Sequence, residues 1–209
     1  MKKLTLLLIV IATVVSGCKN STLSGSPGTT TAPSDPKADV IEASRKFIAL
    51  KSLTGKIEAD AATPYKQQVE YAAPDRYRIV YRDNSGVEAE TIMGGDEAWV
   101  KDGNSWKKMA GGTSPTPTMR LPFTEEGLKS ISDVKFEREE SVNGVPTLVY
   151  SYKQVTVVGN FPKKQTIWVS KSSGLPIKSY VEYSGSGPIK TLSTTFDTET
   201  PVTINLPSK

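Results

Sequence analysis

The chain has 209 residues, with 26 lysines and arginines, 22 acidic residues, no histidine and one cysteine. Without histidine, a histidine general base and a histidine metal ligand are both excluded. The first 17 residues hold two lysines and no acidic residue, so the remainder carries 24 basic and 22 acidic side chains. This near balance gives little support for a basic surface that binds nucleic acid.

The N-terminus has the layout of a secretory signal peptide. Lys2 and Lys3 precede a stretch from Leu4 to Val15 that is apolar apart from two threonines, and small residues follow it. As a helix, these 12 residues would measure about 18 Å, whereas the hydrocarbon of a bilayer is about 30 Å thick. We therefore expect residues 1–17 to be a signal peptide that is removed.

The single cysteine follows directly, and Val15-Ser16-Gly17-Cys18 resembles the bacterial lipobox. The resemblance implies cleavage before Cys18, a diacylglyceryl thioether on its sulfur and often an acylated amine, with palmitate as a typical chain. Each buried CH₂ contributes about 0.8 kcal/mol, so two or three chains hold a protein stably on a membrane. The alternative is a soluble secreted protein with a free thiol.

Lipidation of Cys18 would place the chain on the cell membrane or the outer membrane, with its domain facing the periplasm or the outside. In Gram-negative lipoproteins an Asp after the acylated Cys commonly signals inner-membrane retention, so Lys19 favours the outer membrane if the source is Gram-negative. The sequence does not decide the envelope type.

Residues 18–37 are expected to be the lipidated cysteine and a disordered tether. Between 19 and 36 the only large apolar residue is Leu23, and Ser, Thr, Gly and Pro dominate. At about 5–6 Å × √n, such a segment reaches roughly 20–25 Å from the membrane. The remaining 172 residues, 38–209, are long enough for one domain that buries roughly 70% of its unfolded surface.

The first structured element is predicted to be a helix over 36–51. Ser34 or Asp35 can cap it, and Pro36 suits its first turn. Apolar residues recur at helical spacing, so this helix is expected to pack its apolar stripe on a sheet.

After residue 53 the period of the apolar pattern changes from 3.6 to 2, which indicates strands. Asn84-Ser85-Gly86 suits a three-residue hairpin loop with glycine in the left-handed region. That loop predicts the pairs Asp83–Val87, Arg82–Glu88, Tyr81–Ala89, Ile79–Thr91 and Tyr77–Met93.

A second hairpin signal, Asn143-Gly144, gives a less consistent register. A two-residue loop there would place Phe136 opposite Ser151, and the apolar faces of the two strands would then disagree. We therefore expect a bulge near Pro146 or a longer loop.

A second short helix is predicted over 124–131, with Thr124 as its cap and two acidic residues in its first turn. A long Pro/Gly/Thr loop at 111–122 precedes it. Together with the strands predicted before and after this loop and helix, the chain forms an α+β domain. We expect a curled antiparallel sheet of about 9–11 strands, an open half-barrel packed on the two helices. One helix is too narrow to cover so many strands, so a concave apolar surface should remain.

Aromatic and apolar side chains on one side of successive strands could line that hollow. They could equally be ordinary core, because strands favour these residue types. The candidate lining residues are Phe47, Val69, Tyr71, Tyr77, Ile79, Tyr81, Met93, Trp99, Tyr150 and Tyr152. Arg76, Arg78 and Arg82 form an outward stripe that could meet lipid headgroups, although cross-strand ion pairs explain it more simply.

The order of several short segments resembles the LolA-like and LppX/LprG-like lipoproteins. These segments are LTGKIEA, AAPDRYRIVYR, GGDEAWVKDGNSWKKM, IWVSKSSGLPIKSYVEY and PVTINLP, spread over most of 38–209. The resemblance implies a half-open antiparallel barrel with helices across its mouth. It also implies an apolar hollow of the kind that holds acyl chains of lipoproteins or glycolipids in characterised relatives.

The sequence therefore favours a membrane-anchored exported lipoprotein that binds a lipid or a lipoprotein acyl chain as carrier, chaperone or sensor. The alternative is a structural lipoprotein of the cell envelope that has a protein partner and no small ligand. No enzyme is expected, because the sequence holds no serine motif with a histidine partner, no metal-ligand cluster and no phosphate loop. No cofactor, no metal and no nucleic-acid partner is expected either.

Overall fold

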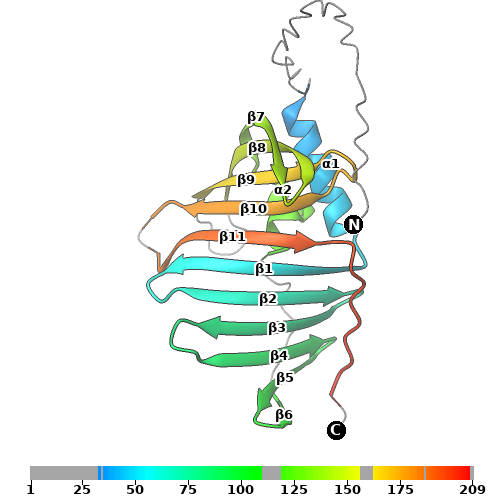
Figure 1. Cartoon of the computed structure of the whole chain (residues 1–209), viewed down its shortest axis with the longest axis vertical. Helices are drawn as coiled ribbons and strands as arrows, with labels where there is room; N and C mark the ends of the chain where they lie inside the picture. The colour runs from blue at the N-terminus through cyan, green and yellow to red at the C-terminus, as the bar shows by residue number, and fades with distance from the viewer. Residues whose placement is uncertain (1–32, 34, 110–118, 156–161, 186, 208–209) are drawn as a thin grey trace, which may run out of the picture.

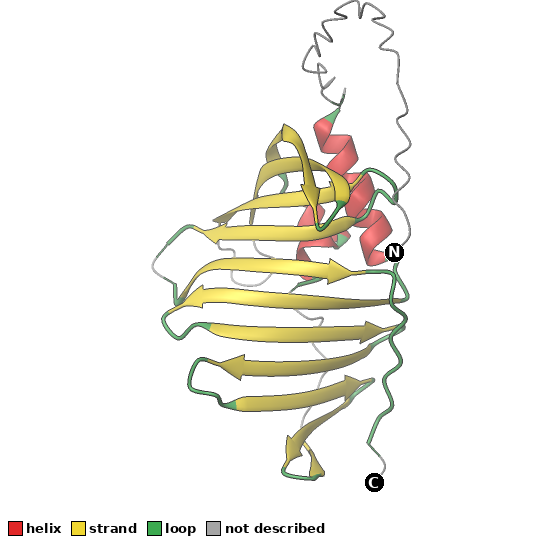
Figure 2. Cartoon of the chain, in the orientation of Figure 1, coloured by secondary structure: helices red, strands yellow, loops and turns green. Residues whose placement is uncertain are grey.

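The structure, a computed structural model, describes residues 33, 35–109, 119–155, 162–185 and 187–207. Within these ranges, eleven antiparallel strands form one sheet, joined by two α-helices and a 3₁₀ helix (Figures 1 and 2). The elements are α1 (Pro36–Ile48), β1 (Ser52–Ala61), β2 (Tyr65–Ala72), β3 (Arg76–Asp83), β4 (Glu88–Gly94), β5 (Glu97–Asp102), β6 (Ser105–Lys108), η1 (Leu121–Phe123), α2 (Glu125–Lys129), β7 (Ser132–Val142), β8 (Val145–Val155), β9 (Pro162–Ser170), β10 (Pro176–Tyr183) and β11 (Ile189–Asp197).

The predicted α+β arrangement of 9–11 strands with two helices is confirmed, and the sheet is its dominant part. The predicted signal peptide, the lipidated cysteine and most of the tether lie outside the described residues. No helix in the described part of the chain has both the length and the apolar content needed to cross a bilayer.

Helix α1 begins as its sequence predicts. The Asp35 carboxylate accepts a hydrogen bond from the Ala38 amide at 3.0 Å, and Pro36 occupies the first turn. The helix ends at Ile48, three residues before the predicted end, because β1 already begins at Ser52. Its buried stripe faces the sheet and consists of Val40, Ala43, Ser44 and Phe47.

The sheet is built from two meanders that meet at its centre. Strands β1 to β6 follow one another in space, as do β7 to β11, and β1 pairs with β11 to join them. Strands β6 and β7 form the two edges, so the sheet is open, and β7–β9 curve around the side of α1 (Figure 1). Helix α1 and the η1–α2 segment lie against one face, which we call the concave face.

The β3–β4 hairpin has the predicted register. Gly86 takes a positive φ of 85°, and the Asp83 carboxylate accepts hydrogen bonds from the Ser85 and Val87 amides at 2.9 Å. All five predicted pairs are present: Asp83–Val87 as a backbone hydrogen bond, and Arg82–Glu88, Tyr81–Ala89, Ile79–Thr91 and Tyr77–Met93 in the ladder.

The β7–β8 hairpin corrects a prediction. The loop has two residues, and both Asn143 and Gly144 take a positive φ, so the ladder runs undisturbed past Pro146. The register shifts instead at Glu137, which places Phe136 opposite Tyr150 rather than Ser151. The extra residue is tolerated at Glu137 because β7 is an edge strand and this side chain is exposed to water.

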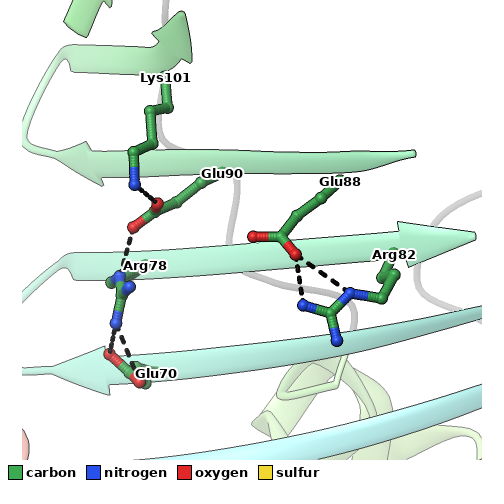
Figure 3. Close-up of polar contacts among 6 residues, drawn as sticks. All are labelled: Glu70, Arg78, Arg82, Glu88, Glu90 and Lys101. Atoms are coloured by element: carbon green, nitrogen blue, oxygen red, sulfur yellow. Dashed lines mark hydrogen bonds and ion pairs between the residues drawn. The ribbon is translucent and has the colours of Figure 1, made fainter. Parts of the chain in front are cut away.

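The opposite, convex face of β2–β5 carries a ladder of ion pairs (Figure 3). Arg78 donates to Glu90 at 2.7 Å and contacts Glu70 at 3.4 Å, and Lys101 donates to Glu90 at 2.6 Å. Burial of the Glu90 carboxyl opposes ionisation, but hydrogen bonds from Lys101 and Arg78 outweigh it and lower its pKa. Cross-strand ion pairing, the simpler explanation of the arginine stripe, is therefore correct for Arg78.

We expect Glu90→Gln to lower the free energy of unfolding by about 1 kcal/mol at pH 7, because it weakens two charged hydrogen bonds of a buried carboxylate. The matched control is Glu88→Gln, since Glu88 pairs with Arg82 at an exposed site where ion pairs contribute less than about 0.5 kcal/mol. Urea unfolding of both variants measures the difference. The Glu90 carboxylate contributes stability above its unfolded pKa, and this contribution is lost as the pH falls through its lowered folded pKa. The free energies of unfolding of the two variants should therefore converge in acid. Equal effects at pH 7 would contradict the burial argument.

Candidate functional site

A cavity of about 670 Å³ lies on the concave face, beside the part that α1 covers. Its floor comes from β1 and β8–β11, and its roof comes from Met119 and the 3₁₀ helix η1. The volume falls in the range of about 300–1,000 Å³ that is usual for small-ligand sites. The arrangement is thus a half-barrel with a pocket on its concave face.

The strand registers place the floor residues in rows, where a row is a set of residues paired side by side across neighbouring strands. Side chains alternate between the two faces along each strand, so every second row points into the cavity. Three rows contribute to the floor: Gln154–Lys163–Tyr183, Gln165–Val181–Leu192 and Ser179–Thr194–Ile57.

The roof is tied to the sheet at defined points. Nε2 of Gln154 donates to the carbonyl oxygens of Pro122 at 2.8 Å and Gly127 at 2.9 Å. Met119 lies over Gly55, where a Cβ would collide with its sulfur, so glycine at this position in β1 allows the roof to approach. These hydrogen bonds and this close contact therefore hold the roof in place over the floor.

Arginine and phenylalanine side chains hold the roof against α1. Arg120 donates to the Ile48 carbonyl at 2.7 Å, and its guanidinium lies 3.8 Å from the centre of the Tyr71 ring. The Phe123 ring contacts Phe47 of α1 at a centroid distance of 4.6 Å. These contacts close the cavity on the side of the helix.

The lining is mostly apolar, and one end of it is cationic. Ile57, Leu121, Val181 and Leu192 are among its apolar side chains, whereas Lys163 lies in the row nearest the β8–β9 and β10–β11 connections. Lys163 is only 5% exposed, and burial lowers the pKa of its ammonium group to about 8. The described lining includes no acidic side chain.

The ten residues predicted to line the hollow take other places. None of them is among the described residues that line this cavity. Seven are buried in the main core cluster: Phe47, Val69, Tyr71, Tyr77, Met93, Tyr150 and Tyr152. Ile79 packs at the border of that cluster, and the Tyr81 ring contacts Tyr65 at a centroid distance of 5.2 Å. Trp99 pairs with Ile92 of β4, so the two side chains share a face. That face is opposite the one to which Met93, the next residue of β4, points.

Sequence reasoning missed the polar lining. In the segment KKQTIWV, Lys163 and Gln165 occupy the same alternating positions as Ile167, which is fully buried. Two long polar side chains at inward positions of a strand were a signal of a polar patch on the concave face, because such side chains are rarely buried without a reason. The structure also shows no group of three acidic, cysteine or histidine residues suited to a metal ion in its described part.

Solved structures that include a bacterial lipoprotein share this fold, an open antiparallel half-barrel with helices across its concave face. The structure is similar to the lipoprotein LppX of Mycobacterium tuberculosis, with 14% sequence identity, coverage of 81% of this chain and 98% of LppX, and a TM-score of 0.60. It is also similar to LprF of Mycobacterium bovis, with 12% identity, coverage of 86% and 100%, and a TM-score of 0.64. These matches confirm the predicted resemblance to the LppX/LprG-like fold. No family model and no curated protein sequence matches the chain.

Proposed function

We propose that this chain is an exported lipoprotein, anchored to a membrane through Cys18, whose half-barrel binds a lipid acyl chain as carrier, chaperone or sensor. The observation that carries the proposal is the 670 Å³ cavity on the concave face, lined largely by apolar side chains. The similarity of the fold to the lipoprotein LppX supports the same function.

The physical reason is the free energy of apolar surface in water. A concave apolar wall is favourable only when something apolar covers it, and the covering is worth roughly 25 cal/mol per Å². Helix α1 covers one part of the concave face, whereas the space between the floor and the roof of the cavity remains for a ligand. An acyl chain is flexible and narrow, and so suits a cavity between a strand floor and a fixed roof.

The anchor and the tether belong to the proposal, because they lie outside the described residues. A lipidated Cys18 followed by about 18 residues of tether would hold the cavity within roughly 20–25 Å of the bilayer. A domain held there could take up or deliver a lipid without leaving the membrane surface.

The test uses the mature chain with Cys18→Ala, produced once with a cytosolic start and once with an export signal. We expect organic extracts of the purified protein to contain a lipid at near one equivalent by mass spectrometry. The same substitution should move the protein from the membrane fraction to the soluble fraction, which tests the anchor separately. Extracts without lipid from both sources would contradict lipid binding. A single stoichiometric protein crosslinked in cells, again without lipid, would favour the alternative of an envelope protein partner.

A further inference from the structure

Lys163 is a buried cation for which the described protein supplies no counter-charge. It points from β9 into the cavity, is 5% exposed, and forms neither an ion pair nor a hydrogen bond with any described residue. Its neighbours in the row are Gln154 of β8 and Tyr183 of β10, and neither is an acid. A largely buried ammonium group without a charged partner destabilises the fold, so its place at the cavity suits a partner from outside the described residues.

The next row carries unpaired hydrogen-bonding atoms of its own. Gln165 is fully buried and lines the cavity, and neither its Nε2 nor its Oε1 has a hydrogen-bond partner. Oε1 of Gln154 is also unpaired, although Nε2 of the same side chain holds the roof. With the hydroxyl of Tyr152, the residue opposite Gln165 in the β8–β9 ladder, these two adjacent rows hold four buried polar atoms without a hydrogen-bond partner, whereas buried polar atoms normally have one.

The charged side chain of Lys163 lies at one end of a largely apolar lining. Val181 and Leu192 lie in the same row as Gln165. The next row inward holds Ile57 together with the small polar side chains of Ser179 and Thr194, and the roof above it consists of the apolar residues of η1. The only charged side chain of the described lining therefore lies at the end near the β8–β9 connection, and the rest of the lining is uncharged and largely apolar. A ligand that matches this arrangement has a polar group at one end and a hydrocarbon chain at the other.

The charge decides which polar group fits. An ammonium group donates hydrogen bonds and accepts none. Of the unpaired amide atoms, Nε2 of Gln165 donates and the two Oε1 atoms accept, so the charge of Lys163 and not the amides sets the sign of the headgroup. With no acidic side chain in the described lining, a cationic headgroup would be repelled by Lys163, and a neutral hydroxyl would leave the ammonium charge uncompensated.

We infer that the cavity binds an amphiphile with an anionic headgroup, a carboxylate or a phosphate, whose oxygens lie against Lys163 and Gln165 while its acyl chain lies along Val181, Leu192 and Ile57. The inference rests on the proposed lipid-binding function and specifies the chemical class of its ligand. Lys163 is the residue that selects the headgroup, and the apolar side chains supply affinity for the chain without regard to charge.

Calorimetric titration of the delipidated Cys18→Ala protein tests the inference with ligands that share one chain. We expect palmitate to bind at least about tenfold more tightly than hexadecanol, because charged hydrogen bonds contribute about 1.5–3 kcal/mol. Lys163→Met should remove this preference while hexadecanol affinity stays the same or rises. Lys163→Arg should keep the preference, and its retention would show that charge rather than shape is responsible.

The matched control is Lys164→Met, the adjacent residue in β9, whose side chain is 59% exposed and pairs loosely with Glu182. This variant should bind palmitate as the parent does. A further arm compares 1-palmitoyl-lysophosphatidate with 1-monopalmitoylglycerol and with inorganic phosphate, which separates a phosphate headgroup on a chain from a carboxylate and from a free anion.

The outcomes separate the headgroup inference from the proposed function. If palmitate and hexadecanol bind equally to the parent protein, or if Lys163→Met keeps the preference, the headgroup inference is wrong and lipid binding stands. If no amphiphile binds, both fail. Near-ultraviolet circular dichroism of each variant confirms that it is folded, and Gln165→Leu, with an expected loss of about threefold for palmitate, provides an independent substitution in the same patch.

Discussion

Replacing Phe47 by alanine is expected to lower the free energy of unfolding by about 4 kcal/mol, the largest effect of a single substitution that we predict. The Phe47 ring is fully buried where the helix, the roof and the sheet meet. Its centroid lies 4.6 Å from that of Phe123 in η1 and 4.7 Å from that of Phe196 in β11. Removal of the ring creates a cavity and also breaks both aromatic contacts, which contribute about 0.5–1.5 kcal/mol each beyond burial.

Urea unfolding followed by tryptophan fluorescence measures this loss, and thermal unfolding should show a decrease in Tm of roughly 8–16 °C. Val87→Ala is the control, because Val87 is 57% exposed at the β3–β4 loop and its truncation should change stability by less than about 0.5 kcal/mol. A loss below about 1.5 kcal/mol for Phe47→Ala would mean that α1 is not integral to the core, and the half-barrel would then lack the wall that separates core from cavity.

The sequence allowed the hairpins to be predicted where turn chemistry and alternation agree. Gly86 in the left-handed region fixes the β3–β4 loop, and the residues that it pairs belong to matching faces. The β7–β8 register could not be derived in the same way. A bulge at an exposed edge position accepts almost any residue. The residue type at Glu137 therefore does not indicate the register shift that occurs there.

The site was harder to predict than the fold, because alternation identifies the concave face but not which part of that face a helix covers. Tyr71, Tyr77 and Tyr150 do point to the concave side, and there they are buried in the core cluster. The cavity lies over β8–β11 and β1, on the other side of β1 from the β2–β4 residues predicted to line it. A search for apolar lining also passes over Lys163 and Gln165, which are the residues with the clearest reason to meet a ligand.

The pH dependence of stability gives a second large effect, and it concerns Lys163 in the ligand-free protein. Burial lowers the pKa of its ammonium group from 10.5 to about 8. Between these two values the unfolded chain binds more protons than the folded one, so the free energy of unfolding contributed by this residue rises with pH. Below about pH 8 the charged group is buried at its full cost, and above about pH 10.5 the cost is gone. Tyr183 in the same row and Tyr152 in the next stay neutral over most of this range, because burial raises the pKa of each.

We therefore expect Lys163→Met to be more stable than the parent protein by about 2 kcal/mol at pH 7, with the difference shrinking as the pH approaches 10. Urea unfolding of both proteins at each pH measures the difference in their free energies of unfolding. Every other titrating group is present in both proteins, so its contribution cancels in this difference. Lys164→Met, at the exposed neighbouring position, should show no such gain.

Saturating palmitate should reverse the order of stability at pH 7. A carboxylate beside Lys163 compensates its charge, so the ligand stabilises the parent protein through binding to the folded state more than it stabilises the methionine variant. If Lys163→Met is instead less stable than the parent in the absence of any lipid, a group of the protein itself compensates the charge, and the argument for an anionic ligand loses its physical basis. A chain that keeps a destabilising lysine in its cavity, and recovers the lost stability only with an anionic amphiphile, would be one whose binding site is selected at the expense of its fold.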